Sequence, residues 1–293
     1  MPALGFGTAT LGRETNEDES RRILDAAYAL GIRHFDTAEA YGGGNARLYR
    51  QTQLGIDDVR EASGLMHSSE IILGRWVRER GIRQEVTLAT KTSNGRNVSA
   101  SLQRSLARMG LDAIDIYYLH SIPADVPLRQ PLAEMEEAPE IGAVGVCNAT
   151  RAQLAEARAQ YGQSPFSLAQ PSVDLWSCCR EEGVQFVAYS PLAAGFLTGK
   201  YGARGELQPQ GTRFDVIPGH RDLYFHEAAF AALARLEALA QATGLTKSLL
   251  ALAWVLRHAD ISVVLVGATR VEHLHNAARA QQLKLDEELW QRL

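Results

Sequence analysis

The stretch VTLATKTSNGRNVSASLQRSLARMGLDAIDIYYLH, residues 86–120, decides the fold. Its apolar periodicity and its turn residues predict two strands and a helix between them, at Val86–Thr90, Val98–Met109 and Ile114–Leu119. Two strands joined by a helix form a parallel βαβ unit. A single polar residue directly follows each predicted strand, Lys91 after the first and His120 after the second. The stretch therefore predicts a parallel sheet with chemistry at the carboxyl ends of its strands.

The same alternation runs along the rest of the chain. Six further strands are predicted, at Leu4–Thr8, Arg33–Phe35, Val144–Cys147, Ser167–Gln170, Gln185–Tyr189 and Ile261–Val266. Helical patterns separate them, at Glu17–Leu30, Ser68–Arg80, Arg151–Gln160, Trp176–Glu182, Glu227–Ala242, Lys247–His258 and Val271–Gln282. Eight strands with interleaved helices are typical of the α/β class and of a (β/α)8 TIM barrel.

We expect residues 1–293 to form a single barrel domain, because no linker or change of composition divides the chain. Two segments interrupt the alternation, a glycine-rich insertion at about 43–68 and a cofactor loop at about 192–223. Helices should be abbreviated where the connections are short, at 131–143 and 170–176. The first strand starts without an N-terminal hairpin.

Composition favours a small-molecule enzyme. The net charge is -4 and there is no dense run of basic residues, which argues against nucleic acid and membrane partners. Without a signal peptide or a membrane-spanning apolar run, we expect the protein in the cytoplasm. The three cysteines and the pair His273 and His275 lack metal-ligand spacing, so no metal site is expected.

Two more polar residues follow the predicted strand at 33–35, Asp36 directly and Tyr41 five residues later. In a barrel, the carboxyl ends of the strands meet on one face, so Asp36, Tyr41, Lys91 and His120 should share a site. A tyrosine protonates a carbonyl efficiently if its pKa is lowered. Lys91 could lower it, Asp36 could hold Lys91, and His120 could orient the substrate. Each residue taken alone could also be a structural ion pair or hydrogen bond.

Six ordered motifs across nearly the whole chain resemble those of aldo-keto reductases: Gly5–Gly12, Phe35–Gly42, Ala89–Thr92, Ser105–Asp112, Asp115–His120 and Ala188–Leu192. The resemblance implies a barrel that binds NADPH in an extended pose and reduces aldehydes or ketones reversibly. It implies that Tyr41 is the acid, that Lys91 lowers its pKa, that Asp36 pairs with Lys91, and that His120 orients the substrate. A monomer is favoured by the same resemblance, although a homo-oligomer is compatible with it.

The resemblance also implies cofactor contacts. Thr8 lies in the first motif, Asn148 and Gln170 match positions that hold the carboxamide, and Tyr189 matches the aromatic that stacks on the nicotinamide. Matches to the pyrophosphate and adenosine phosphate contacts are Ser190, Pro191, Leu192, Lys200 and Arg213, and the two cations favour NADPH over NADH. The adenosine segment comprises Gly267, Thr269, Arg270, His273 and Asn276, where His273 and Asn276 depart from the usual pattern.

Three questions stay open at this stage. The protein could bind NADPH as a regulatory sensor with little turnover, or it could be an unrelated isomerase or lyase that forms a Schiff base on Lys91. The insertion separates Tyr41 from Ser69-Glu70, which in the family follow the tyrosine within a few residues. It could fold over the substrate pocket or form a surface loop. The substrate is not identified by these residues.

Overall fold

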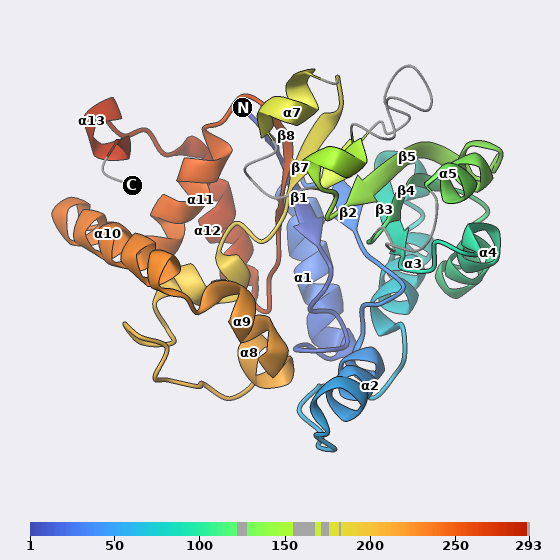
Figure 1. Ribbon diagram of the computed structural model, residues 1–293, viewed down its shortest axis with the longest axis horizontal. Helices are drawn as coiled ribbons and strands as arrows, with labels where there is room; N and C mark the ends of the chain where they lie inside the picture. Colours follow the sequence, from blue (N-terminus) through green and yellow to red (C-terminus); the bar gives the residue numbers. More distant parts are fainter. Residues whose placement is uncertain (122–127, 155–167, 171–175, 182, 292–293) are drawn as a thin grey trace.

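The strands form a closed parallel barrel. The computed structural model describes residues 1–121, 128–154, 168–170, 176–181 and 183–291. Within these residues eight strands pair side by side in chain order, and β1 also pairs with β8 to close the barrel (Figure 1). The strands are β1 Ala3–Gly7, β2 His34–Asp36, β3 Thr87–Thr92, β4 Ile114–Leu119, β5 Ile141–Cys147, β6 Leu168–Gln170, β7 Gln185–Ala188 and β8 Ile261–Val266. The predicted α/β class, with parallel strands separated by helices, is confirmed.

Helices surround the barrel (Figure 1). The longer ones are α1 Glu17–Ala29, α2 Gly43–Leu54, α3 Ser68–Arg80, α4 Val98–Met109, α10 Glu227–Thr243, α11 Lys247–Leu256 and α12 Val271–Gln282. The shorter ones are α5 Arg129–Glu136, α7 Trp176–Glu181, α8 Arg213–Val216, α9 Arg221–Tyr224 and α13 Glu287–Trp290. Of the predicted helix at 151–160, residues 155–160 lie outside the described residues.

Local sequence explains where the helices begin and end. The side chain of Asn16 caps α1 by accepting from the Glu19 N–H, and the Glu19 carboxylate accepts from the Asn16 N–H in return. Asn97 caps α4 in a similar way, and Gly110 ends it with φ at 65°, a conformation that glycine adopts without strain. The buried faces of these helices pack on the outside of the strands. A smaller cluster fills the barrel interior, with Ala89, Ile116, Tyr118, Val187 and Leu265.

The insertion contains a helix that the sequence analysis did not predict. Residues 43–54 form α2, so the expectation of a loop throughout 43–68 is wrong for this part. Its glycines stand only in the first turn, where Gly43 and Gly44 approach the backbone of Ser63 and Gly64 too closely for any larger residue. Residues favourable to a helix follow them. The glycine content therefore reflects close packing at the start of a helix.

The cofactor loop at 192–223 is also more regular than expected. It contains two 3-10 turns, η3 Ala193–Thr198 and η4 Pro218–His220, besides α8 and α9. As predicted, the helices after β4 and β6 are short, with eight residues in α5 and six in α7. No single described helix has the length and apolarity to cross a membrane, although α10 and α11 pass that test together with a 105° bend between them.

Candidate active site

The four polar residues predicted to share a site are in contact. Asp36 is the last residue of β2, Lys91 lies near the end of the neighbouring β3, and His120 follows β4 directly. The Lys91 ammonium donates to the Asp36 carboxylate and, over 2.7 Å, to the carbonyl of Thr37. It lies 5.3 Å from the centroid of the Tyr41 ring. The barrel therefore gathers a buried ion pair and a tyrosine at one point on its rim.

Burial and neighbouring charges together set the protonation of these residues. Burial is the largest influence on Lys91 and opposes its charge, but Asp36, Tyr41 and Cys147 together raise the pKa of the ammonium. Burial also raises the pKa of Tyr41, and the nearby ammonium offsets only part of this effect. Lys91 therefore acts on the phenol in the expected direction, but the net pKa of Tyr41 lies above its ordinary value because burial is the larger influence. Tyr41 keeps its proton and Lys91 its charge at neutral pH.

His120 is held as a neutral imidazole. Burial, and then the positive charge of Lys91, lower the pKa of His120 to about 3. The ring meets that of Tyr41 edge to face, with the centroids 5.5 Å apart and the planes at 84°. Its Nδ1 atom is buried and has no hydrogen-bond partner among the described residues. A neutral imidazole beside a protonated phenol suits the recognition of a carbonyl oxygen.

A hydroxyl network lies beneath these residues. Thr8, predicted as a cofactor residue, donates from its hydroxyl to the carbonyl of Asp36 over 3.0 Å and lies 2.8 Å from the Ser69 hydroxyl. The adjacent Glu70 accepts from Thr90 of β3 over 2.7 Å. The insertion therefore extends outward between Tyr41 and Ser69, and leaves the Ser-Glu pair against the barrel.

Two of the residues predicted to hold the nicotinamide, Asn148 and Tyr189, form a hydrogen-bonded chain that begins at His120. The amide of Asn148, directly after β5, donates to the carbonyl of His120 over 2.8 Å and accepts from the Tyr189 hydroxyl over 2.6 Å. Tyr189 follows β7, and its side chain is 40% exposed, so a face of the ring is accessible. Gln170 ends β6 opposite Cys147 of β5. Burial raises the pKa of the Cys147 thiol to about 12, which leaves it unreactive.

The turn after β7 has a strained backbone. Ser190, Ala193 and Ala194 adopt φ values of 53°, 48° and 55°, in the left-handed region that residues other than glycine rarely occupy. Pro191 and Leu192 lie between them and are partly buried. Such strain persists mainly where a ligand site requires the shape. The turn therefore has the character of a binding loop.

Cations gather beside this turn. The charges that act on Lys200 include those of Glu14, Arg213 and Arg270, and burial together with the two guanidinium groups lowers the pKa of its ammonium. The Arg213 Nε donates to Glu14 over 2.9 Å. Three cations with one carboxylate leave a positive excess. This donor set fits the phosphates of a dinucleotide cofactor.

Several residues of the segment predicted to bind adenosine form hydrogen bonds with one another. Gly267 follows β8 and is exposed, and the Thr269 N–H donates to Nδ1 of His273 over 3.3 Å. Arg270 lies 3.2 Å from the other ring nitrogen of His273, and burial followed by the Arg270 charge lowers the pKa of that imidazole. The Asn276 amide donates to Ser248 of α11 over 3.3 Å. His273 thus orders the start of α12 beside Arg270.

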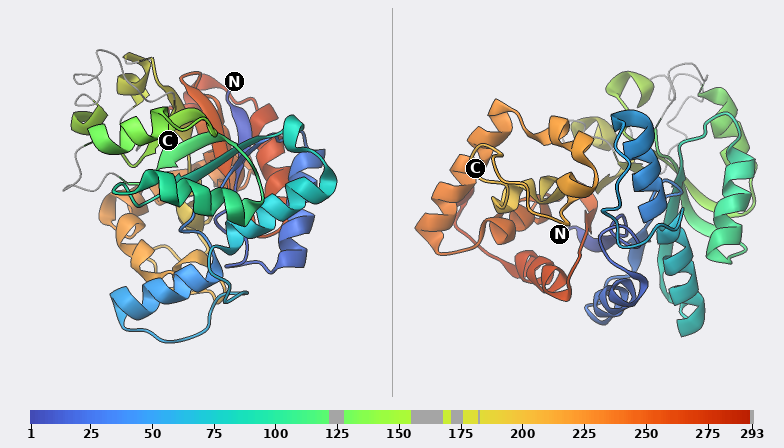
Figure 2. Two further views of the ribbon diagram at one scale, coloured as in Figure 1. Left: turned by 90° about the vertical axis from the view of Figure 1, so that its right-hand side faces the viewer. Right: turned by 90° about the horizontal axis from the view of Figure 1, so that it is seen from below.

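The insertion and the cofactor loop pack against each other. The Arg50 guanidinium, fully buried, donates to the carbonyl of Val216 over 2.7 Å and to Glu61 over 2.5 Å. Arg60 pairs with Asp215 over 3.1 Å. We call the contacts between residues 43–68 and 213–220 the clasp. Figures 1 and 2 show α2 beside α8 on one side of the barrel.

The sequence analysis did not single out three charged or titratable residues near these cations. They are Arg13 and Glu14, which follow β1, and His220 of η4. Arg13 is 4% exposed and its Nε donates to Glu14 over 2.7 Å. Burial and then the charges of Arg213 and Arg13 lower the pKa of His220 to about 4. The signal was present in the sequence, since Arg13-Glu14 follows a predicted strand as the other polar residues do.

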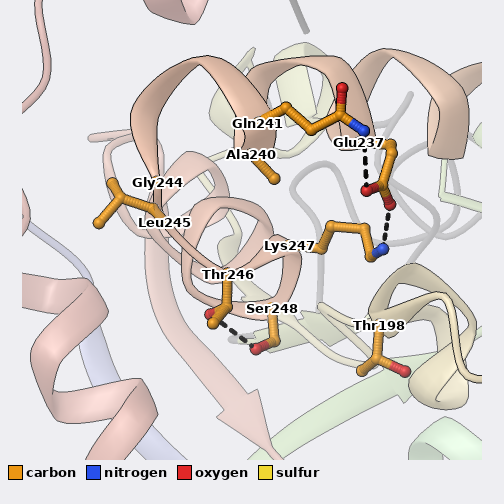
Figure 3. Close-up of a pocket in the computed structure, with 9 residues that line it drawn as sticks. All are labelled: Thr198, Glu237, Ala240, Gln241, Gly244, Leu245, Thr246, Lys247 and Ser248. Carbon is orange, nitrogen blue, oxygen red and sulfur yellow. Dashed lines mark hydrogen bonds and ion pairs between the residues drawn. The ribbon is translucent and has the colours of Figure 1, made fainter.

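An open hollow lies between η3 and the helices α10 and α11 (Figure 3). Lys247 of α11 pairs there with Glu237 of α10, and Thr198 of η3 lies across from them. None of the four predicted catalytic residues lines it. Within the described part of the chain, no group of three or more His, Cys, Asp or Glu side chains is placed to hold a metal ion.

Known proteins match this chain along nearly its whole length. The profile of the Aldo/keto reductase family matches residues 3–293. The L-glyceraldehyde 3-phosphate reductase of Escherichia coli is 30% identical, over 96% of this chain and 84% of its own. The aldo-keto reductase yakc (NADP(+)) of Schizosaccharomyces pombe is 27% identical, over 98% of this chain and 86% of its own. The chain belongs to the aldo/keto reductase family of oxidoreductases.

Proposed function

We propose that this protein uses NADPH to reduce an aldehyde or ketone to the alcohol, with Tyr41 as the proton donor. The observation that carries the proposal is the contact of the buried Lys91–Asp36 pair with Tyr41, and of Tyr41 with His120. A buried ion pair costs desolvation energy, so its position beside a phenol and a neutral imidazole supports a chemical role.

The four side chains divide the work of protonating a carbonyl oxygen. A bound nicotinamide supplies the hydride that the carbonyl carbon accepts. His120 donates a hydrogen bond that orients the carbonyl oxygen, and Tyr41 gives its phenol proton to that oxygen as the C–O double bond becomes single. Lys91 then stabilises the phenolate by its charge, and Asp36 keeps Lys91 in place. Because its resting pKa is raised, Tyr41 is fully protonated before each cycle.

NADPH rather than NADH is proposed from the cations beside the strained turn. The charges of Arg213 and Arg270 both act on Lys200, so a phosphate among these cations would relieve their repulsion of its ammonium. The printed name of yakc includes NADP(+). Tyr189 offers an exposed ring for stacking, and Asn148 is held beside it. These contacts support an extended cofactor that runs from Asn148 to Arg270.

The two alternative functions, a Schiff-base enzyme and an NADPH sensor, fit the geometry less well. A Schiff-base enzyme needs a neutral lysine, whereas the Lys91 pKa is raised and its ammonium bonds Asp36 and Thr37. A sensor with little turnover does not need a proton donor positioned beside a charged lysine and an imidazole, whereas Tyr41, Lys91 and His120 lie together here. The insertion is proposed to cover the cofactor phosphates rather than form a separate surface loop, because the clasp ties it to residues 213–217.

The substitution Tyr41→Phe tests the proposal. It removes the proton donor but keeps the ring, so turnover should fall by about 10²- to 10⁴-fold, the usual size of general acid catalysis. NADPH affinity, read by quenching of protein fluorescence, should stay close to that of the unsubstituted protein. Turnover is read as NADPH consumption with a panel of aldehydes.

Two results would contradict the proposal. Undiminished turnover in Tyr41→Phe would remove Tyr41 from the role of acid. Tight NADPH binding by the unsubstituted protein, without turnover of any aldehyde or ketone in the panel, would favour the sensor. A parallel titration with NADH tests the preference for the phosphorylated cofactor.

A further inference from the structure

Arg13 is a buried arginine with unused hydrogen-bonding capacity. Its side chain is 5% exposed, and Nε donates to the Glu14 carboxylate over 2.7 Å. One terminal nitrogen, Nη2, is buried and has no partner among the described residues. A guanidinium carries five N–H donors and is costly to bury, so an unpaired terminal nitrogen in the interior requires an explanation.

The loop that carries Arg13 touches the loop that carries Tyr41. The carbonyl of Gly12 lies so close to Gly43, two residues after Tyr41, that a Cβ on Gly43 would be 2.5 Å from it. The Arg13 carbonyl accepts from the Ala62 N–H over 2.7 Å, which fixes the loop against the insertion. Arg13 and Tyr41 are near enough for their charges to interact. The loop of Arg13 therefore packs against the loop that carries the proposed proton donor.

Glu14 links two of the cations of this region. Its second oxygen accepts from Arg213 over 2.9 Å, so one carboxylate serves two guanidinium groups. Lys200 interacts with Arg270 and Arg213, which are proposed to bind the cofactor phosphates. Arg13 interacts with Arg213 and also with Tyr41, the proposed proton donor. With one negative charge shared between two positive ones, Arg13 and Arg213 retain an excess positive charge.

We infer that Arg13 binds an anionic group of the substrate, so that the preferred substrates are aldehydes or ketones that carry a carboxylate or a phosphate. This inference rests on the proposed function and narrows its substrate class. Oxygen atoms of either anion would accept from the unused Nη2 of Arg13 while Glu14 holds Nε in place. The group would then fix the distance of the substrate carbonyl from Tyr41.

Matched substrates and the variant Arg13→Gln test the inference. The pairs are 4-oxobutanoate with butanal, and glyceraldehyde 3-phosphate with glyceraldehyde. A hydrogen bond to a charged group contributes about 1.5–3 kcal/mol, so kcat/KM for the charged member should fall about 10- to 100-fold. The neutral member should be nearly unaffected. Comparison of the two pairs shows whether a carboxylate or a phosphate is preferred.

Two further variants separate substrate from cofactor and from structure. Arg13→Lys keeps the charge and should retain part of the selectivity for the anion. Arg270→Gln should weaken NADPH binding and leave the ratio between charged and neutral substrates unchanged. Weaker NADPH binding by Arg13→Gln, with that ratio unchanged, would place Arg13 on the cofactor and overturn the inference. So would an equal loss with charged and neutral substrates.

A binding measurement keeps the inference independent of turnover. Succinate and inorganic phosphate, titrated into the NADP+-loaded protein, should raise its thermal unfolding midpoint, and Arg13→Gln should abolish the rise. If this occurs in a protein that reduces no aldehyde, the proposed function fails and the anion site stands. An equal rise in protein and variant, or no rise in either, would overturn the site whatever the turnover.

Discussion

Lys91 and Arg50 are both fully buried cations that pair with carboxylates, and they differ in what surrounds them. Arg50 donates to Asp58, Glu61 and the carbonyl of Val216 from all three of its nitrogens, so its hydrogen-bonding capacity serves the clasp. Lys91 pairs with one carboxylate and one carbonyl and keeps its charge 5.3 Å from the Tyr41 ring. Arg50 holds the insertion and the cofactor loop together, whereas Lys91 lies beside Tyr41, the proposed proton donor.

Arg13 shows how the comparison extends to a third buried cation. It has one carboxylate partner, as Lys91 does, but one of its terminal nitrogens is unpaired. The number of acceptors around each buried cation thus matches the structural role of Arg50 and the functional roles proposed for Lys91 and Arg13. A buried cation whose N–H groups all donate to acceptors inside the protein is a poor candidate for ligand binding.

The substitution Lys91→Met should have the largest effect. It leaves Asp36 buried without its partner, so the free energy of unfolding should fall by about 3–5 kcal/mol and turnover by at least about 10²-fold. Urea unfolding and NADPH consumption measure the two losses. The double variant Asp36→Asn with Lys91→Met should recover much of the stability and none of the turnover. Recovery of turnover would mean that the pair has only a structural role.

The substitution Arg50→Met should have a smaller and more local effect. It leaves Glu61 buried and the Val216 carbonyl without a donor, at a local cost of about 3 kcal/mol. Amide hydrogen exchange should quicken in residues 57–62 and 213–217, while the barrel strands stay protected. NADPH should dissociate faster, because residues 213–217 lie in the proposed cofactor loop.

Arg60→Gln is the matched control for this variant. The Arg60–Asp215 pair is partly exposed, with side chains 31% and 21% accessible, so its loss should cost at most about 1 kcal/mol. Exchange in the two segments should therefore rise much less than in Arg50→Met. Exchange that quickens in 57–62 alone after Arg50→Met would show that the clasp does not couple the insertion to the cofactor loop.

The smallest effect is expected from two partly buried histidines, His120 and His220, and only in acid. The pKa of His120 is lowered to about 3 and that of His220 to about 4, whereas an unfolded histidine titrates near 6.5. Below pH 6.5 the unfolded chain takes up protons that the folded chain refuses, so stability falls as pH decreases toward these values. Each histidine adds at most about 1.4 kcal/mol per pH unit to this slope.

The variants His120→Gln and His220→Gln should each flatten the slope of stability between pH 6.5 and the lowered pKa. His120→Gln reports on the barrel and His220→Gln on the clasp. Unfolding by urea at several pH values measures both, and at pH 8 neither variant should show a charge-related difference. An unchanged slope for either variant would mean that its imidazole is not held neutral in the folded protein.

Much of the barrel was predictable from the sequence because its contacts are made by neighbouring strands. The strands at 114–119 and 261–266 and the helices at 68–80, 98–109 and 271–282 have the predicted bounds. Parallel pairing of β2 with β3 and of β3 with β4 then brings Asp36, Lys91 and His120 to one rim. Alternating strand and helix periods were sufficient for this part of the site.

Contacts between distant irregular segments were not predictable. Arg213 and Glu14 are 199 residues apart in the sequence, and no periodic pattern relates them. The helix α2 was missed because its glycines, read as turn residues, serve a close approach of backbones in three dimensions. The pKa of Tyr41 was misjudged because desolvation depends on packing, whereas the sequence shows only which charges are present.

The clasp has a consequence for the synthesis of the chain. Arg50 and Val216 are separated by 166 residues, so Arg50 leaves the ribosome long before its acceptor on α8 exists. Glu61, Asp58 and Arg50 can pair early, but the insertion can dock on α8 only after β7 and the segment beyond it have been made. The barrel rim next to Tyr41 is therefore completed late, and a chain truncated before residue 213 would keep all four proposed catalytic side chains while leaving the clasp unformed.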